Sequence, residues 1–297
     1  MDIAVALVPS LLFGALSLLL GAFPTDTRRQ NTAVMVGAGA VSLMCSALLA
    51  VPWSPRATVW GAVCGLMWTG GQVFVLRAFR AWGVSRTMPL TTALQLLLNA
   101  TLGVSLFGEW RAPGALPLGT VALALIMAGA AACSWQERTG PGPTSAQRRD
   151  GLLATAASAV LYGSYPSLLR AAHVPSAHAV GPMGLGLLAG AVLCALVLPR
   201  RSPLRGPRIA PAVLAGGLWA IGNALMLRST AAVGVASGFT LSQLGFVLAT
   251  VGGLTVLGEK RTGREQAVVA AGVVAAVVGL VLMGLATSMD SGPSSSG

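Results

Sequence analysis

The chain has 297 residues, of which 55% are apolar and only 9% are charged, and its formal net charge is +11. An average soluble domain carries roughly 25% charged residues, so this composition excludes an ordinary soluble protein and indicates one that lipid solvates. Lys and Arg occur in small groups between apolar runs and not in one patch. This distribution argues against nucleic acid as a partner and favours loops at a membrane surface.

Ten apolar runs are long enough to cross a bilayer, which takes about 20 residues per helix. Their hydrophobicity does not alternate as membrane β-strands require, so helices are predicted. In chain order the runs cover residues 3–23, 31–51, 58–79, 83–107, 115–135, 151–170, 177–198, 210–229, 234–257 and 264–287. The prediction is an all-α integral membrane protein with ten transmembrane helices.

The orientation follows from the basic residues between the runs. Most Lys and Arg lie after the first, third, fifth, seventh and ninth runs. Cytoplasmic loops carry an excess of these residues, so both termini are predicted to be extracytoplasmic in a multi-pass protein of the plasma membrane.

The two halves of the chain repeat each other. With an offset of 151 residues, Gly65, Trp68 and Gly71 coincide with Gly216, Trp219 and Gly222. With an offset of 150 residues, Gly103, Gly108 and Glu109 coincide with Gly253, Gly258 and Glu259. Five helices per copy is an odd number, so the second copy enters the membrane from the opposite face. Inverted repeats are typical of secondary transporters, although an inert duplicated bundle is the alternative.

The predicted organisation follows from this repeat. Residues 1–140 form the first five-helix repeat, 141–150 a linker, 151–287 the second repeat and 288–297 a disordered tail. Small residues recur every four positions in the fifth and tenth runs, at Ala124, Ala128, Ala132, Ala271, Ala275 and Gly279. Such spacing lets helix backbones approach closely, either within the chain or in a homodimer.

Polar side chains inside membrane spans tend to mark a solute pathway. Two equivalent runs each carry a Trp followed four residues later by an amide, as Trp68 with Gln72 and Trp219 with Asn223. An indole can cover the apolar face of a sugar while an amide bonds its hydroxyls. Interfacial anchoring and helix–helix hydrogen bonds are the alternatives. The predicted substrate-binding residues are Trp68, Gln72, Thr92, Gln95, Asn99, Tyr162, Trp219, Asn223, Thr240 and Gln243.

Charged residues lie at the ends of the runs. Glu109 and Glu259 each follow a Gly there, and Arg77 and Arg228 lie near helix ends. These four are the candidates for coupling or gating, with pairing to fix a loop as the alternative role of the two Glu. The sequence has no catalytic constellation and no metal-ligand or cofactor motif, so neither an enzyme nor a metal or cofactor site is predicted.

Four segments resemble the bacterial glucose/ribose uptake proteins of the drug/metabolite transporter superfamily: "GLMWTGGQ", "GVSRTMPLTTALQLLLNATLGVSLFGEW", "GGLWAIGN" and "VGVASGFTLSQLGFVLATVGGLTVLGEK". The resemblance covers about a third of the chain. It implies ten helices in two inverted five-helix repeats and uptake of a monosaccharide, with coupling to protons left open. The chain departs from the family in Arg77 and Arg80 and in a first helix with few polar groups, which offers little to a sugar.

The sequence therefore predicts a secondary-active transporter that moves a neutral, glucose- or ribose-like monosaccharide by alternating access. The binding site is expected between the third, fourth, eighth and ninth runs. Two alternatives remain open at this point: a drug or metabolite exporter of the same superfamily, and a membrane scaffold that transports nothing. Expected partners are the solute, the lipid bilayer and, for a coupled carrier, protons.

Overall fold

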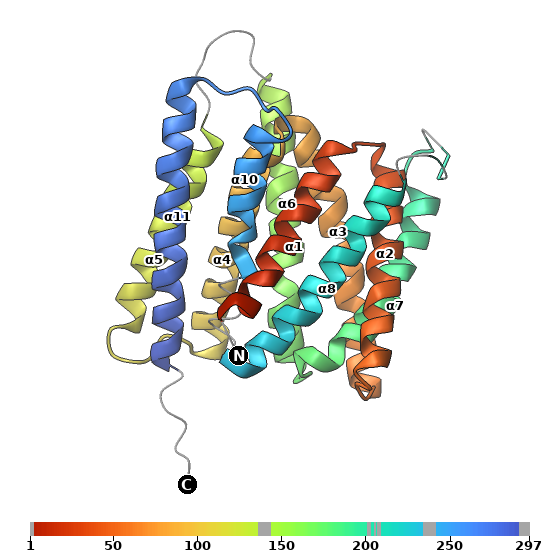
Figure 1. Ribbon diagram of the computed structural model, residues 1–297. Helices are drawn as coiled ribbons and strands as arrows, with labels where there is room; N and C mark the ends of the chain where they lie inside the picture. The colour runs from red at the N-terminus through yellow and green to blue at the C-terminus, as the bar shows by residue number, and fades with distance from the viewer. Residues whose placement is uncertain are drawn as a thin grey trace.

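The computed structural model describes residues 3–135, 144–200, 203–204, 206, 209–233 and 242–290, and across these residues it contains helices and no strands (Figure 1). The helices are α1 (Ile3–Ala22), α2 (Thr27–Leu48), α3 (Pro55–Trp82), α4 (Val84–Phe107), α5 (Ala115–Ser134), α6 (Ser145–Ala171), α7 (Ser176–Val197), α8 (Ile209–Val233), α10 (Gly245–Thr255) and α11 (Gly263–Asp290). The ten helices confirm the predicted all-α membrane fold, since eight are long and apolar enough to cross a bilayer.

Local capping explains where several helices begin earlier than hydropathy predicts. Asp26 accepts a hydrogen bond from the Arg29 amide at 3.2 Å, so α2 begins at Thr27 and includes Arg29. Thr144 and Gln147 form a capping box, so α6 begins at Ser145 and the last six residues of the predicted linker are helical.

The end of the chain also differs in detail from the predicted runs. Helix α11 extends to Asp290 and so includes residues 288–290 of the predicted tail. Of the predicted run 234–257, residues 234–241 lie outside the described part of the chain, and α10 covers the second half.

Helices from the two halves of the chain pack between one another instead of forming two separate bundles. Helix α2 packs against α7 and α8, and α3 packs against α6 and α7. Helix α1 packs against α8 and α10, while α4 packs against α6 and α10. If α1, α2, α3 and α4 are exchanged with α6, α7, α8 and α10 in that order, the contacts of α2 with α7 and of α4 with α10 map onto themselves. Each of the other contacts maps onto another one of the set.

Glycines at equivalent sequence positions allow this close packing. A Cβ added to Gly65 on α3 would lie 2.3 Å from the Met183 carbonyl oxygen on α7. A Cβ added to Gly216 on α8 would lie 2.0 Å from the Val34 carbonyl oxygen on α2. At both positions the backbones touch, which is how membrane helices gain packing energy without a hydrophobic driving force.

Helices α5 and α11 pack against each other at one side of the molecule (Figure 1). Gly129 and Gly272 make this contact, since each would place a Cβ within 2.8 Å of the other's carbonyl oxygen. The predicted small residues Ala124, Ala128 and Ala271 are exposed on the outer faces of the pair.

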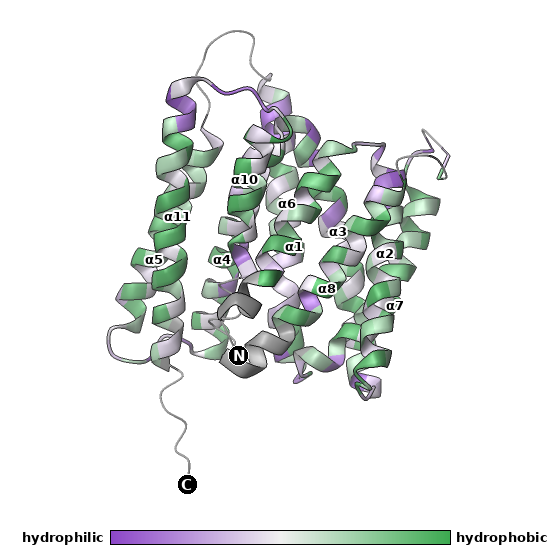
Figure 2. Ribbon diagram, viewed as in Figure 1, coloured by the Kyte–Doolittle hydropathy of each residue, from purple (hydrophilic) through white to green (hydrophobic). Residues whose placement is uncertain are grey.

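Figure 2 shows hydrophobic residues along most of the helix lengths, with hydrophilic residues gathered mainly at the helix ends. Several large apolar side chains are exposed on the outside, among them Leu48 and Val197, each 77% exposed. In water such exposure would be costly, whereas in a bilayer these side chains meet lipid tails.

Candidate functional site

A cavity of about 100 Å³ lies between α1, α3, α4, α6, α8 and the segment 242–246. Its aromatic lining consists of Phe13, Trp68, Tyr162, Tyr165, Trp219 and Phe246. Its other polar lining residues are Ser17, Thr92, Gln95, Ser242 and Gln243. Both halves of the chain therefore contribute to one cavity that combines aromatic faces with hydroxyl and amide groups.

The two repeated tryptophans meet at this cavity. The rings of Trp68 and Trp219 have centroids 4.2 Å apart with an interplanar angle of 35°. Tyr162 stacks on Trp68 with centroids 5.4 Å apart and an interplanar angle of 22°. Both indoles are at most 5% exposed, so they form part of a closed aromatic wall across the two halves.

The amides predicted beside these tryptophans lie behind the wall. Gln72 is 2% exposed and Asn223 is 3% exposed, and neither lines the cavity. The Tyr162 hydroxyl donates a hydrogen bond to Gln72 Oε1. Gln72 Nε2 is buried and has no hydrogen-bond partner among the described residues. In each predicted pair, the Trp therefore lines the cavity and the amide does not.

Helix α4 separates its predicted binding residues in a similar way. Thr92 and Gln95 line the cavity, whereas Asn99 does not. Asn99 Nδ2 donates to the Gln95 carbonyl at 3.0 Å, and Asn99 Oδ1 accepts from Ser167 at 3.4 Å. Gln243 lies at the cavity, while Thr240 falls outside the described residues.

Helix α1 contributes more than its sequence indicates, because Phe13, Leu16 and Ser17 all line the cavity. The Ser17 hydroxyl donates to the Phe13 carbonyl at 3.0 Å. Sequence analysis did not select this helix, because its few polar groups were expected to offer little to a sugar, yet the structure places three of its residues at the cavity. A usable signal was the spacing of Ser10 and Ser17, two helical turns apart on one face and both buried.

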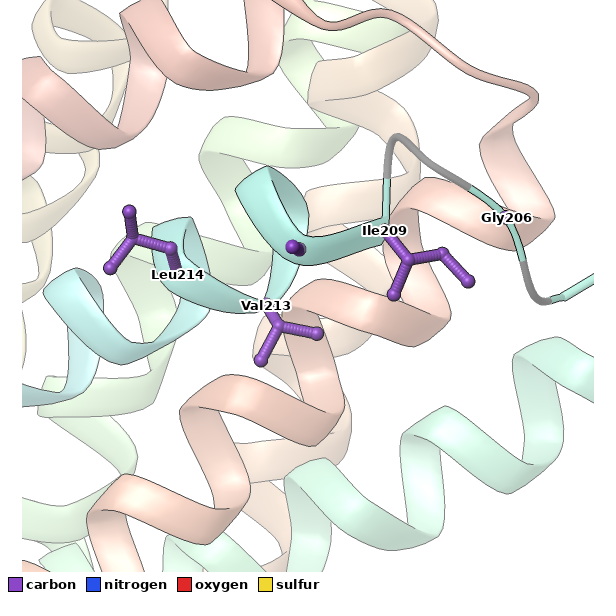
Figure 3. A pocket seen from close by; sticks show the side chains of 5 residues that line it. Gly206, Ile209, Val213 and Leu214 are labelled. Carbon is purple, nitrogen blue, oxygen red and sulfur yellow. The ribbon is translucent and has the colours of Figure 1, made fainter.

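A larger hollow of about 620 Å³ lies along the beginning of α8. Its lining residues are Gly206, Ile209, Ala210, Val213 and Leu214, with apolar side chains and no polar one (Figure 3). Leu214 is 56% exposed. The lining residues that the structure describes are apolar, and they suit contact with lipid better than recognition of a polar solute.

The repeated glutamates lie at opposite ends of the helices and away from the cavity. Glu259 Oε1 accepts hydrogen bonds from the amides of Val84 at 2.7 Å and Ser85 at 3.3 Å, and Oε2 accepts one from the Ser85 hydroxyl. These groups begin α4, whose N-cap Gly83 supplies no side-chain cap of its own. A carboxylate at this position satisfies free amides and complements the helix dipole.

The other predicted charged residues make contacts at helix ends. Glu109 forms an ion pair with Arg170 at the end of α6. Arg77 pairs with Asp150 at 2.8 Å, and both of these side chains are about half exposed. The side chain of Arg228 lies outside the described residues.

Arg261 lies beside the contact between Glu259 and α4. Arg261 Nη2 donates to the Ser85 hydroxyl at 3.0 Å, and Nη1 donates to the Trp135 carbonyl at 3.2 Å. Burial, followed by the charge of Arg86, lowers the pKa of Arg261, while Glu265 and Glu259 act in the opposite direction. This end of the molecule therefore joins α4 to the segment before α11 through several polar contacts.

Comparison with known proteins places the whole chain in one family. The model of the sugar transport protein family matches residues 4–286. This chain belongs to the sugar transport protein family. The glucose uptake protein GlcU of Bacillus subtilis is 33% identical over 291 residues, covering 96% of this chain and 99% of the relative.

One further relative shows the same membership, and one solved structure shares the fold. A Listeria innocua protein, named as a candidate sugar uptake protein, is 34% identical over 289 residues, with 96% of this chain and 99% of the relative covered. A crystal structure at 22% identity matches 96% of each chain with a TM-score of 0.60, which shows a shared fold.

Proposed function

We propose that this protein is a secondary-active carrier that moves a neutral, glucose- or ribose-like monosaccharide across the plasma membrane by alternating access. The observation that carries the proposal is the cavity to which helices of both halves contribute aromatic, hydroxyl and amide groups. Such groups suit a sugar, because its C–H faces pack on aromatic rings and its hydroxyls form hydrogen bonds. The family membership and the name of the Bacillus subtilis relative support the same solute class.

The cavity favours a neutral solute over a charged one. None of the lining residues in the described part of the chain carries a charge. A carrier of uncharged polyols therefore fits this cavity better than an exporter of amphiphilic cations.

Alternating access is supported by the way the two halves pack. The exchangeable helix contacts are those expected of two inverted five-helix repeats, which would adopt mirror-related states open to opposite sides. Most basic residues lie near the Glu259 end, and we infer that this end faces the cytoplasm and that both termini lie outside.

We assign a gating role to Glu259, because its carboxylate joins the two halves where α4 begins. Opening the cavity toward this end requires that contact to break. The ion pair of Glu109 with Arg170 holds the segment after α4 against α6, and the exposed ion pair of Arg77 with Asp150 joins α3 to α6. Proton coupling would involve a group outside the cavity lining that the structure describes, since that lining contains no carboxylate or histidine.

Counterflow in proteoliposomes tests the proposal without knowledge of the coupling ion. Vesicles loaded with unlabelled glucose, ribose or rhamnose should transiently accumulate the same labelled sugar for at least one of the three. Repeating the assay with an imposed pH gradient reports on proton coupling. A folded sample that accumulates none of these sugars would contradict the proposed function.

A matched pair of variants on α4 tests the position of the site. Gln95→Ala removes a cavity-lining amide, and we expect the counterflow rate to fall about five- to tenfold, the effect of one lost hydrogen bond. Asn99→Ala lies one turn further along, outside the cavity, and should leave the rate within about twofold. Equal effects of both variants would argue against this cavity as the binding site.

A further inference from the structure

The aromatic side chains on the two walls of the cavity are structural counterparts. On α3, a Cβ added to Gly71 would lie 2.5 Å from Tyr162 Cδ1. On α8, a Cβ added to the equivalent Gly222 would lie 2.8 Å from Phe13 Cε1. Tyr162 on α6 and Phe13 on α1 therefore each pack on a glycine of the repeated motif, and both line the cavity.

The two walls differ in one hydroxyl group. Tyr162 donates its proton to Gln72 Oε1, the amide that follows Gly71. Asn223 follows Gly222 at the equivalent position, but Phe13 has no hydroxyl to offer it. At this pair of counterpart positions, α6 therefore presents a phenol hydroxyl and α1 presents an apolar ring.

The hydrogen bond to Gln72 also fixes the chemical character of the Tyr162 oxygen. A phenol has one proton to donate, and Gln72 receives it, so the remaining lone pair of Tyr162 can only accept. Gln72 Nε2 remains a donor with no partner among the described residues. Tyr162 lines the cavity whereas Gln72 lies behind it, so a solute reaches the pair through the Tyr162 oxygen. A solute hydroxyl that packs against this oxygen without bonding to it leaves a polar group unsatisfied.

We propose that the Tyr162–Gln72 pair determines which sugar hydroxyl is recognised and therefore the orientation in which the solute binds. One solute hydroxyl donates to Tyr162, and an apolar C–H face of the sugar packs toward Phe13. This inference rests on the proposed function as a monosaccharide carrier. It assigns the selection of the solute to one wall of the cavity, the wall that α3 and α6 form.

Monodeoxy sugars combined with Tyr162→Phe test this proposal. The assay is competition of counterflow by each monodeoxy derivative of glucose, or of ribose where ribose is the sugar that accumulates. In the wild type, removing one particular hydroxyl should weaken competition about tenfold. In Tyr162→Phe the parent sugar should bind about tenfold more weakly, and that particular deoxy sugar should bind as well as the parent.

Two further variants keep the test decisive. Ser164→Ala removes another hydroxyl of α6, one that donates to the Val160 carbonyl and does not line the cavity, and it should keep the wild-type pattern of deoxy sugars. Gln72→Leu preserves the bulk of the side chain but removes the acceptor of the Tyr162 hydroxyl, which is then free to donate to the solute. This variant should weaken the discrimination between the parent sugar and the deoxy sugar, and it serves as the test if Tyr162→Phe folds poorly. This inference alone is overturned if the wild type accumulates sugar and both Tyr162→Phe and Gln72→Leu rank the deoxy sugars as the wild type does. A wild type that accumulates no sugar contradicts the proposed function together with this inference.

Discussion

The two Gly-Glu segments of the chain share a backbone turn and differ in what their carboxylates contact. Gly108 and Gly258 both end a helical segment with φ of +64°. The amides of Glu109 and Glu259 then donate to the carbonyls of Gly103 and Gly253, at 3.0 and 3.1 Å respectively. Beyond this turn, Glu109 meets an exposed Arg170, whereas Glu259 accepts bonds from the beginning of α4.

This difference shows that the two copies of a repeated motif can share a turn while their Glu side chains make different contacts. The turn depends on residues within six positions of one another, so each copy forms it independently. The carboxylate's partner comes from a helix far away in the sequence, and that partner differs at the two ends. An exposed ion pair contributes little, while a carboxylate on free helix amides contributes a cap and charge-assisted hydrogen bonds.

The largest expected effect comes from Gly253→Ala. The new Cβ would lie 2.9 Å from Ser85 Cβ and 3.1 Å from the Ser85 amide, so α4 must move away from the Glu259 segment. We expect a loss of about 2–3 kcal/mol, typical of overpacking, seen as a lower thermal unfolding midpoint in detergent. The control is Gly103→Ala, where the three atoms nearest to the new Cβ all belong to the Glu109 side chain, which can rotate away. Equal losses in both variants would show that the two contacts are equally tight.

The next effect is that of Glu259→Ala. It leaves the first amides of α4 without their carboxylate, and we expect a loss of about 2 kcal/mol in unfolding free energy. Because the contact joins the two halves, the ratio of inward- to outward-open protein should also change. Accessibility of a single cysteine introduced into the cavity lining measures that ratio. An unchanged ratio would remove the gating role from Glu259.

A smaller and nearly equal effect is expected of Gly108→Ala and Gly258→Ala. Both positions have φ of +64°, where an L-residue costs about 1 kcal/mol relative to glycine. At Gly258 no atom lies within 4 Å of the added Cβ, while at Gly108 it meets the flexible end of Arg111. Thermal unfolding of both variants should give similar shifts. A large difference would mean that the shared turn is not what sets their stability.

The smallest effect is that of Glu109→Ala. The ion pair with Arg170 has side chains that are 32% and 53% exposed, so its removal should cost less than about 0.5 kcal/mol. Raising the salt concentration should abolish even this difference, because salt screens exposed charges. Unfolding midpoints at low and high salt, with counterflow rates beside them, check the expectation. A loss matching that of Glu259→Ala would contradict the comparison.

Sequence analysis predicted part of the cavity and missed part of it for definable reasons. Trp68 and Trp219 were found because a bulky polar-tipped residue repeated in register is rare in apolar sequence. Phe13 was missed because a Phe among Leu residues has no distinguishing pattern. Asn99 was selected with Gln95 because both are polar and share a face of α4, yet Asn99 lies one turn further along the helix, beyond the cavity, where it contacts Ser167 on α6.

The sequence by itself determined the membrane environment, the all-α fold and the positions of most helices, because length and hydropathy alone decide what a bilayer accepts. It also determined the local turns, since Gly, Asp and Thr act on neighbours within a few residues. Only the tertiary structure decided that α1 lines the cavity, that Gln72 lies behind Tyr162, and that Glu259 meets α4. Those contacts join residues 90 or more positions apart, and they depend on which helix faces pack together.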